Sequence, residues 1–368
     1  SYVRQFAGLP ELRSVAIMLA SMPSRTELNV RKGKHGRFPW ILSIANLLFL
    51  VALCIVEAVI AERHWLAMLV TYAPQQVFLA PLAALLVASL LARDRRALAL
   101  NALAGVLSLT LLLGFRVPLR MPSRASGPTV RVMTCNIHHG SHGAVRIAEA
   151  IRRLEPDVVC LQEANALKPW KDPKPELLRS LRGWHSTTVS DRQVVLSRHP
   201  ITSQRAHWFP CTNLREVTHA VISVDGLRLN VLNAHFITSE SGRSLSQSRG
   251  AVRAYVKEAA SARSRQYAGL TAIAGGLEGP LVIAGDFNTP PRGRLYRRFC
   301  RRFTDSFRAA GFGFGYTFRS DVPVERIDHI FVGEGLSVIS CRASRVSISD
   351  HRPVVADLAV IWPRETGA

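Results

Sequence analysis

Hydrophobic positions concentrate in the first third of the chain, in three runs that are too long for the helices of a soluble core. These runs cover residues 38–61, 65–92 and 97–115. An α-helix rises about 1.5 Å per residue, so about 20 apolar residues cross the roughly 30 Å hydrocarbon layer of a bilayer. The pattern therefore predicts three transmembrane helices, which together form a membrane anchor over residues 38–115.

Two features inside these runs modify the picture. Pro74 and Pro81 interrupt the second run, and proline in a helix interior predicts a kink. Glu57 lies about one turn from the end of the first run, where a carboxylate can extend to the water interface. We therefore expect a bent second helix and a Glu57 side chain that reaches water.

The orientation in the membrane follows from the basic residues beside the three runs, since Lys and Arg concentrate in cytoplasmic flanks. The segment before the first run and the turn before the third are basic, whereas the turn between the first and second carries little net charge. The basic flanks contain Arg31, Lys32, Lys34 and Arg37, and then Arg93, Arg95 and Arg96. This arrangement predicts that residues 1–37 form a basic cytoplasmic segment and that the chain after the third helix lies outside the cytoplasm.

Residues 116–128 are rich in Pro, Gly, Ser and Arg and predict a linker, and residues 129–368 form a separate domain. That domain alternates short β-rich runs with two helical stretches, at 144–154 and 246–274. The β-rich runs cover residues 130–133, 157–161, 193–196, 217–224, 227–234, 281–284, 327–332 and 354–360. Many strands and few long helices predict an α+β fold, a two-sheet β-sandwich flanked by helices.

Charge and cysteine content add little to this division. Residues 1–120 hold 13 Lys and Arg against 5 Asp and Glu, and the remainder holds 34 against 21, so both parts are basic. A basic field favours anionic partners such as nucleic acid, lipid headgroups or phosphorylated small molecules.

The six cysteines form no C-x-x-C pair, and Cys54 falls in the first hydrophobic run. The odd number that remains argues against a full disulfide framework.

Polar residues with chemical potential stand at the ends of the predicted strands. Each block places one or two polar side chains directly after an apolar run, where burial is costly unless the polar ends meet and bind something. The five blocks are Thr134-Cys135-Asn136-Ile137, Leu161-Gln162-Glu163, Asn233-Ala234-His235, Gly285-Asp286-Phe287-Asn288, and the pair Arg326-Ile327-Asp328-His329 with Ser349-Asp350-His351-Arg352-Pro353.

With all five blocks in this order, the chain resembles the endonuclease/exonuclease/phosphatase superfamily over residues 130–360. The sharpest signatures are Gly285-Asp286-Phe287-Asn288 and Ser349-Asp350-His351. That superfamily includes apurinic endonucleases, pancreatic-type deoxyribonucleases, neutral sphingomyelinases and inositol-polyphosphate phosphatases. The resemblance implies a divalent-metal-dependent phosphoester hydrolase that works by in-line attack of water.

The resemblance also implies a metal site made of oxygen ligands. Glu163 is the principal metal ligand that we expect, with Asn136 assisting and Asp350 supporting the metal or its bound water. Hard cations such as Mg²⁺ or Mn²⁺ prefer oxygen ligands of this kind. Whether one or two ions bind is left open by the sequence.

The catalytic roles follow in the same way. Asp286 would orient the attacking water or accept its proton, and Asn288 would donate to the oxyanion of the transition state. His351 would contact the scissile phosphate while Asp328 holds its imidazole in place. His235 would contact a phosphate or protonate the leaving group.

Several neighbouring residues are interpreted differently. Arg215 is a candidate contact for a substrate phosphate. His138, His139 and His142 follow Asn136, but no second cluster matches them as zinc ligands, so we expect a polar loop at the rim. His329 stands where the family often has an aromatic residue, and we expect it to be structural.

Three functions remain open. The first is a hydrolase of lipid-linked phosphoesters, which is favoured by the anchor because tethering raises the effective concentration of the enzyme at the bilayer. In this respect the chain resembles a bacterial membrane branch of the superfamily, which is implicated in lipid-carrier phosphate metabolism and glycopeptide resistance. A nuclease acting outside the cytoplasm is favoured by the basic charge, although aromatic residues make up only 7% of the chain. An inactive membrane scaffold is disfavoured by the complete set of motifs.

Overall fold

The fold is described here from a computed structural model, in which residues 25–118, 127–166, 171–209, 215–238 and 249–361 are described. The chain separates into two compact units. The first comprises Ser1–Val51 and Phe78–Leu107, and the second comprises Ala52–Val77 and Ser108–Ala368.

The first unit is helical and is held together by a polar contact in its interior. Its helices are α2 (Arg25–Ile55), which continues into the second unit, α4 (Leu79–Leu91) and α5 (Arg95–Leu107). The Nδ2 atom of Asn101 lies 3.0 Å from the Oγ atoms of both Ser43 and Ser89, and all three side chains are buried. A single amide thus ties the three helices together, as polar residues do between helices in membranes.

Among the residues that the structure describes, two helices are long and apolar enough to cross a membrane, or up to three if a bent pair counts as one span. The two are Phe38–Arg63 and Arg95–Leu112, which match the first and third predicted helices. The second predicted helix is broken into Trp65–Tyr72 and Gln75–Leu91, which meet at 93°. The predicted bend is therefore confirmed, and its place agrees with Pro74, which lacks the N–H that a continuous helix requires.

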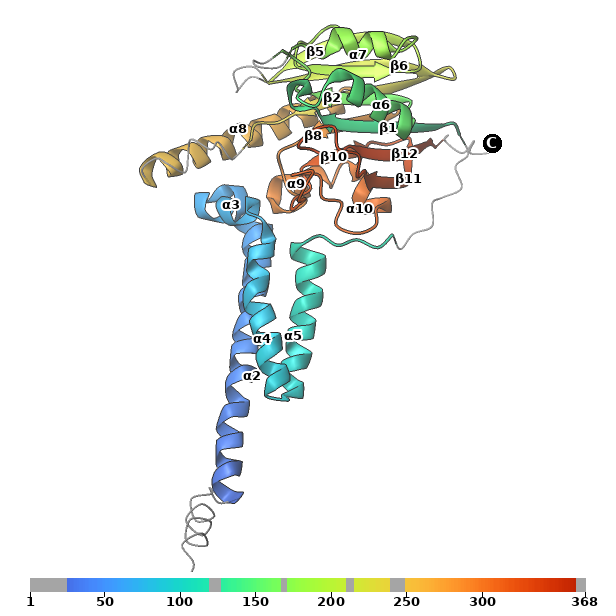
Figure 1. Ribbon diagram of the computed structural model, residues 1–368. Helices are drawn as coiled ribbons and strands as arrows, with labels where there is room; N and C mark the ends of the chain where they lie inside the picture. The colour runs from blue at the N-terminus through green and yellow to red at the C-terminus, as the bar shows by residue number, and fades with distance from the viewer. Residues whose placement is uncertain (1–24, 119–126, 167–170, 210–214, 239–248, 362–368) are drawn as a thin grey trace, which may run out of the picture. The chain divides into compact units, whose positions relative to one another are not determined.

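The second unit is built on two six-stranded sheets, in the strand orders β11-β12-β1-β2-β4-β3 and β5-β6-β7-β8-β10-β9 (Figure 1). The strands of the first sheet are β1 (Thr129–Asn136), β2 (Val158–Gln162), β3 (His185–Ser186), β4 (Gln193–Ser197), β11 (Leu336–Ala343) and β12 (Val354–Val360). Those of the second are β5 (Ile201–Trp208), β6 (Glu216–Val224), β7 (Leu227–His235), β8 (Leu281–Asp286), β9 (Thr304–Asp305) and β10 (Asp328–Val332).

Three hydrophobic layers hold the sheets and helices together. One lies between the two sheets and includes Val132, Val195, Val231 and Ile330. A second packs α6 (Ala144–Leu154) and α7 (Lys174–Ser180) on the outer face of the first sheet. A third packs α8 (Arg249–Gly275) and α9 (Gly293–Phe299) on the outer face of the second sheet through a group of aromatic rings. The short helices α3 (Trp65–Tyr72) and α10 (Ser306–Ala310) complete the unit.

The predicted fold class, two sheets flanked by helices, is confirmed, while several strands were not predicted. Among them are β5 and β11, which lie at sheet edges. No side chain of β5 between Ile201 and Trp208 is buried, whereas β11 buries Leu336 and Cys341 and interrupts its apolar residues with Ser337, Ser340 and Arg342. A strand whose apolar residues are few or interrupted lacks the continuous apolar run that reveals a strand in sequence.

Parallel pairing brings the chemically important strand ends to one edge of the sandwich. β1 runs parallel to β2, so Asn136 is level with Gln162, and β7 runs parallel to β8, so His235 is level with Asp286. The Nε2 atom of Gln162 donates to Oδ1 of Asn233 at 2.7 Å, which joins the two sheets directly beneath this edge. The polar ends of four strands in two sheets are thereby held in one place.

One expectation about the membrane segment is wrong. Glu57 does not reach water: its side chain is only 2% exposed, and its Oε1 atom lies 3.6 Å from Nε of Arg292. Both residues belong to the second unit. Glu57 is therefore part of a buried ion pair, because a cation from the α9 region comes close to it.

Candidate active site

The polar residues predicted from the strand ends come together around the carboxylate of Asp286, which is buried at the end of β8. Its Oδ2 atom lies 3.1 Å from Nδ2 of Asn136, 3.5 Å from Nε2 of His235 and 3.9 Å from Nε2 of His351. These three residues come from the ends of β1 and β7 and from the loop before β12. One oxygen atom is therefore shared by groups that lie far apart in sequence.

A second carboxylate lies beside Asp286. Asp328 begins β10 and is the register partner of Asp286 on β8, so the two side chains share one face of the sheet. Burial and then the charge of Asp328 raise the pKa of Asp286 to about 7. A carboxyl group with such a pKa exchanges protons near neutral pH, as a general base requires.

His351 is held by Asp328 as predicted. Its Nδ1 atom lies 2.8 Å from Oδ2 of Asp328, and the ring of Phe318 covers it at a centroid distance of 4.9 Å. Burial alone would lower the pKa of His351, but the carboxylates of Asp328 and Asp286 outweigh burial and raise this pKa to about 10. The imidazole is therefore charged near neutral pH and presents Nε2–H toward the centre of the site.

His235 is held in the opposite protonation state. Nη1 of Arg215 donates to its Nδ1 atom at 2.7 Å, which places the ring proton on Nε2. Burial and then the Arg215 cation hold the pKa of His235 well below its usual range. His235 is thus a neutral hydrogen-bond donor, and this state favours contact with a phosphate oxygen over transfer of a proton to a leaving group.

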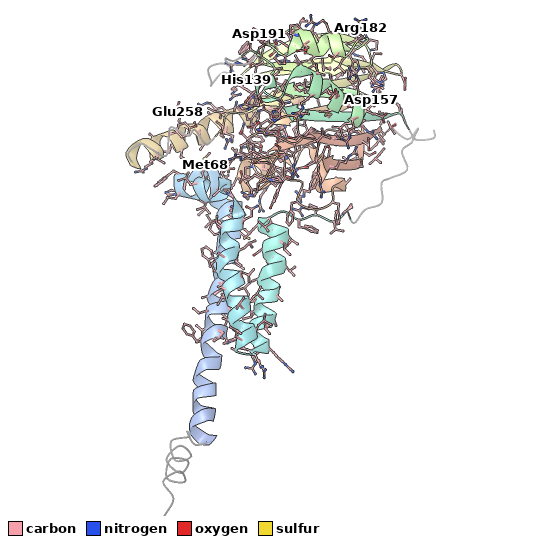
Figure 2. All side chains as sticks on the ribbon, in the orientation of Figure 1. Met68, His139, Asp157, Arg182, Asp191 and Glu258 are labelled. Carbon is pink, nitrogen blue, oxygen red and sulfur yellow. The ribbon has the colours of Figure 1, made fainter. Side chains whose placement is uncertain are left out.

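Glu163 follows β2 and faces two histidines. Its Oε1 atom lies 3.7 Å from Nε2 of His235, and its Oε2 atom lies 3.3 Å from Nε2 of His139. His139, which Figure 2 labels, is in turn 3.1 Å from Oδ1 of Asn165 through its Nδ1 atom. His139 and Asn165 were not among the predicted site residues, although their positions three after Asn136 and two after Glu163 were visible in the sequence.

Backbone conformation at the site is unusual. Glu163 and Asn288 adopt positive φ angles of 52° and 46°, which residues with a side chain rarely do, and His138 and His139 do the same. A Cβ atom on Gly285 would overlap the carbonyl oxygen of Ala234, so the approach of β8 to β7 requires glycine here. Such conformations tend to gather where a fold holds functional side chains in place.

Two predicted residues lie less centrally. Asn288 donates its backbone N–H to Oδ1 of Asp286 at 2.8 Å, but its side-chain Nδ2 atom donates to the carbonyl of Phe236 at 3.0 Å. An amide carries two N–H groups, so one remains for a substrate. Asp350 is at the rim: its side chain is 41% exposed, and its Oδ1 atom lies 3.9 Å from Nδ1 of His138.

His329 is structural, as expected. It is fully buried, and its Nε2 atom lies 2.8 Å from the carbonyl of Thr289 while its Nδ1 atom lies 3.0 Å from Nη1 of Arg326. Both ring nitrogens are therefore occupied within the protein.

The donor atoms fit a hard divalent cation. The predicted ligands Asn136 and Glu163 offer an amide and a carboxylate oxygen, and Asp286 and Asp328 add carboxylates beside them. Oδ1 of Asp328 is buried with no hydrogen-bond partner in the described part of the chain. Asp286, Asp328 and His351 also present atoms within 4.8 Å of one another. A protonated His351 that donates to Asp328 is a poor metal ligand, however, so the fit depends on the oxygen atoms.

Comparison with solved structures supports the same architecture. The endonuclease/exonuclease/phosphatase from Bacteroides vulgatus is 19% identical, with a TM-score of 0.51 over 64% of this chain and 100% of that chain. A family protein from Bacteroides thetaiotaomicron is 15% identical, with a TM-score of 0.52 over 66% and 99% of the two chains. The mannosyl-6-phosphatase of Bacteroides thetaiotaomicron is 16% identical, with a TM-score of 0.50 over 62% and 99%. At these identities the likeness concerns the fold.

Comparison by sequence is more specific. A search among curated proteins finds no match. The model of the Endonuclease/Exonuclease/phosphatase family matches residues 133–351, which is more than half of the 368 residues and contains all the site residues described above. The protein therefore belongs to the Endonuclease/Exonuclease/phosphatase family, as the order of its motifs predicted.

Proposed function

We propose that this protein is a membrane-tethered, divalent-metal-dependent hydrolase that cleaves a phosphoester by in-line attack of water. The observation that carries the proposal is the position of Asp286, whose Oδ2 atom lies within 3.9 Å of polar atoms of Asn136, His235 and His351. A carboxylate surrounded by donors from separate strands is the arrangement that in-line hydrolysis needs. Family membership supports hydrolysis of phosphoesters as the reaction class.

Glu163 and Asn136 would hold Mg²⁺ or Mn²⁺, with Asp350 supporting the ion or its water from the rim. Such a cation supplies neutralisation of the negative charge on the phosphoryl group. The His139 imidazole, 3.3 Å from Glu163, would orient that carboxylate.

Asp286 would accept the proton of the attacking water, since burial and Asp328 raise its pKa to about 7. Asn136 donates to Asp286 at 3.1 Å and keeps the carboxylate turned into the site. Asn288 would donate its remaining amide hydrogen to the oxyanion of the transition state. No covalent intermediate with the enzyme is required.

Two histidines would bind the phosphoryl oxygens from different sides. His351, charged and held by Asp328, offers a charge-assisted hydrogen bond. His235, neutral and held by Arg215, offers Nε2–H without a competing charge. Arg215 would add positive potential for a substrate phosphate behind His235.

We infer that the substrate is a lipid-linked phosphoester at the extracytoplasmic face of the membrane. The anchor of residues 38–115 and the linker of 116–128 would keep the catalytic domain, residues 129–368, close to the bilayer, with the basic segment 1–37 in the cytoplasm. The two or three apolar helices support this arrangement. An extracytoplasmic nuclease is the second candidate, because the part of the chain after residue 120 holds 34 basic against 21 acidic residues. An inactive scaffold is the remote alternative.

A substrate panel tests the proposal. Purified full-length protein with Mg²⁺ is offered undecaprenyl pyrophosphate, sphingomyelin, plasmid DNA and bis(4-nitrophenyl) phosphate. We expect turnover of a lipid-linked phosphoester that stops when the metal is chelated. Faster nicking of DNA than turnover of any lipid would replace the proposed substrate class with nucleic acid, and no metal-dependent hydrolysis of any compound would refute the enzyme assignment.

The side of the membrane on which the catalytic domain lies has a separate test. A cysteine placed at Asp225, in the turn between β6 and β7, should react in intact cells with a thiol reagent that does not cross membranes. A cysteine at Arg93, in the turn between α4 and α5, should stay unreactive until the cells are opened. The reverse pattern would place the catalytic domain in the cytoplasm.

A further inference from the structure

Residues 52–77 cover the end of the first apolar helix, Phe38–Arg63, and the start of the bent second one, yet they belong to the same compact unit as the catalytic strands. They lie outside the region 133–351 that the family model matches. Their contacts with the catalytic part of the chain therefore involve residues that the family model does not match.

The strongest of these contacts is made by Arg292, which is buried just before α9. Its Nε atom donates to the carbonyl of Thr71 at 2.5 Å, and its Nη2 atom donates to the carbonyl of Ala73 at 2.9 Å. The same Nη2 atom lies 2.9 Å from Oε1 of Glu325, and Nε lies 3.6 Å from Oε1 of Glu57. The Arg292 guanidinium thus joins residues 52–77, the membrane-side segment, to two loops of the catalytic domain. These are the loop that carries Arg292 itself and the loop that carries Glu325.

Further contacts surround this ion pair. Glu62 accepts the backbone N–H of Arg294 at 3.0 Å, at the start of α9, and also accepts the hydroxyl of Tyr72 at 3.2 Å. The Nε2 atom of Gln76 donates to the carbonyl of Val324 at 2.9 Å. The segment is therefore attached to the catalytic part at two further points beside Arg292.

Helix α3 itself packs on α8. Met68 and Tyr72 of α3 bury their side chains against Val256 and Ala259 of α8, and the guanidinium of Arg263 lies 4.5 Å from the centre of the Tyr72 ring. Figure 2 labels Met68 on α3 and Glu258 on α8, where the two ribbons approach each other. This apolar contact holds α3 against α8 and adds to the polar contacts around Arg292.

Arg292 is connected to the active site along two short paths. Along the chain it lies four residues after Asn288, which donates its backbone N–H to Asp286. Through space it holds Glu325, whose backbone exchanges hydrogen bonds with Phe318, and the Phe318 ring covers His351 at 4.9 Å. The Asn288 loop and the Phe318–Glu325 loop, which flank the Asp286–His351 pair, are therefore both connected to the guanidinium of Arg292.

We propose that Arg292 is a positioning residue: by binding residues 57–73 of the membrane-side segment, it holds the Asn288 loop and the Phe318–Glu325 loop in their catalytic geometry. The segment would thus be part of the catalytic apparatus as well as a tether. The effect on turnover rests on the proposed function, whereas the effect on the two loops does not.

Arginine is required at this position for a geometric reason. A planar guanidinium donates in several fixed directions at once, and a lysine ammonium at the same place keeps the charge but cannot reproduce that fork. Misplacement of a catalytic group by about 1 Å costs on the order of a hundredfold in rate. Arg292→Lys therefore tests geometry while leaving the buried charge in place.

The experiment compares full-length wild-type protein with Arg292→Lys, Glu57→Gln and the control Arg298→Lys, all in detergent micelles. Arg298 is an exposed arginine on α9, the helix that begins directly after Arg292. Kinetics use bis(4-nitrophenyl) phosphate with Mg²⁺, and hydrogen exchange follows the backbone amides of Phe318 and Glu325. Thermal unfolding establishes that each variant is folded.

We expect Arg292→Lys to lower kcat by roughly tenfold or more with KM changed less than about twofold, because the catalytic groups rather than substrate contacts are displaced. Exchange at Phe318 and Glu325 should accelerate in this variant and in Glu57→Gln, while Arg298→Lys behaves as wild type. A folded Arg292→Lys protein with wild-type kcat and wild-type exchange would overturn the inference.

The variants also separate the possible failures. If Arg292→Lys does not fold, Glu57→Gln decides, and wild-type kcat and exchange in that folded variant would overturn the inference. If the wild-type protein hydrolyses nothing, the proposed function fails, and the exchange measurement still tests whether residues 57–73 hold the two loops.

Discussion

Asp286 and Asp328 face each other as register partners on the antiparallel strands β8 and β10, and both carboxylates are buried. The His351 imidazole makes this pairing possible, since it contacts Asp328 at 2.8 Å and lies 3.9 Å from Asp286. The two carboxylates therefore have different roles. Asp328 stays bound to a charged histidine, and Asp286 keeps a pKa at which it can take up a proton.

Replacement of Asp286 by asparagine should abolish catalysis and preserve the fold. The amide has nearly the same shape but cannot accept the proton of water, so we expect kcat to fall by roughly two to four orders of magnitude. The measurement is hydrolysis of bis(4-nitrophenyl) phosphate, with Asp225→Asn in the distant β6–β7 turn as a matched control. Turnover within tenfold of wild type would remove Asp286 from the role of base.

The activity should depend on pH through both groups of this pair. The rate is expected to fall below about pH 7 as Asp286 takes up a proton, and above about pH 10 as His351 loses one. Metal bound nearby favours the carboxylate, so higher Mg²⁺ should move the acid limb to lower pH. Asp328→Asn removes the charge that raises the pKa of His351 and should move the alkaline limb to lower pH; an unmoved alkaline limb would contradict this assignment.

Glu163 should govern metal affinity. A cation that binds only the folded protein raises its stability by RT ln(1 + [L]/Kd), about 2.7 kcal/mol at one hundred times Kd. We therefore expect Mg²⁺ to raise the thermal unfolding temperature of wild-type protein and to do so much less for Glu163→Gln. Glu149→Gln, a change on α6 outside the site, serves as the control. An equal response of Glu163→Gln and wild type would place the metal elsewhere.

A further buried carboxylate, that of Asp305, should govern stability rather than activity. It accepts two hydrogen bonds from Nη1 of Arg326, at 3.0 and 2.8 Å, and one from the hydroxyl of Tyr296 at 2.5 Å. Breaking a buried pair by removing one partner typically costs about 3–5 kcal/mol. We expect Asp305→Asn to lower the free energy of unfolding by that amount at pH 7, as measured by urea titration of the catalytic domain's tryptophan fluorescence.

The same residue predicts a pH dependence. Burial alone would raise the pKa of Asp305, but Arg326 and its other partners outweigh burial and hold this pKa far below the usual range. Because the folded pKa is lower than the unfolded value of about 3.9, the stabilisation is present above that pH and is lost as the pH falls further. The difference in stability between wild type and Asp305→Asn should therefore shrink below about pH 4, and a constant difference would contradict the assignment.

Local patterns in the sequence were sufficient for the elements with strong periodicity. The buried strands β1, β7, β8 and β12, the helix α6 and the long apolar helices were all predictable, because each is a run of side chains whose spacing reflects one continuous burial pattern. The order of the polar strand ends likewise predicted the family and the residues around Asp286. The edge strands β5 and β11 were not predicted: most side chains of β5 are exposed, and serines and an arginine interrupt the apolar residues of β11.

Only the tertiary structure decided the contacts between distant residues. Nothing near Glu57 in the sequence indicates Arg292, 235 positions later, which buries it as an ion pair. The approach of His139 to Glu163 and the neutral state of His235 beside Arg215 were equally hidden. Hydrophobic periodicity and motif order are properties of neighbours along the chain, whereas ion pairing, tautomer and pKa depend on which groups the fold brings together and on how completely it excludes water from them.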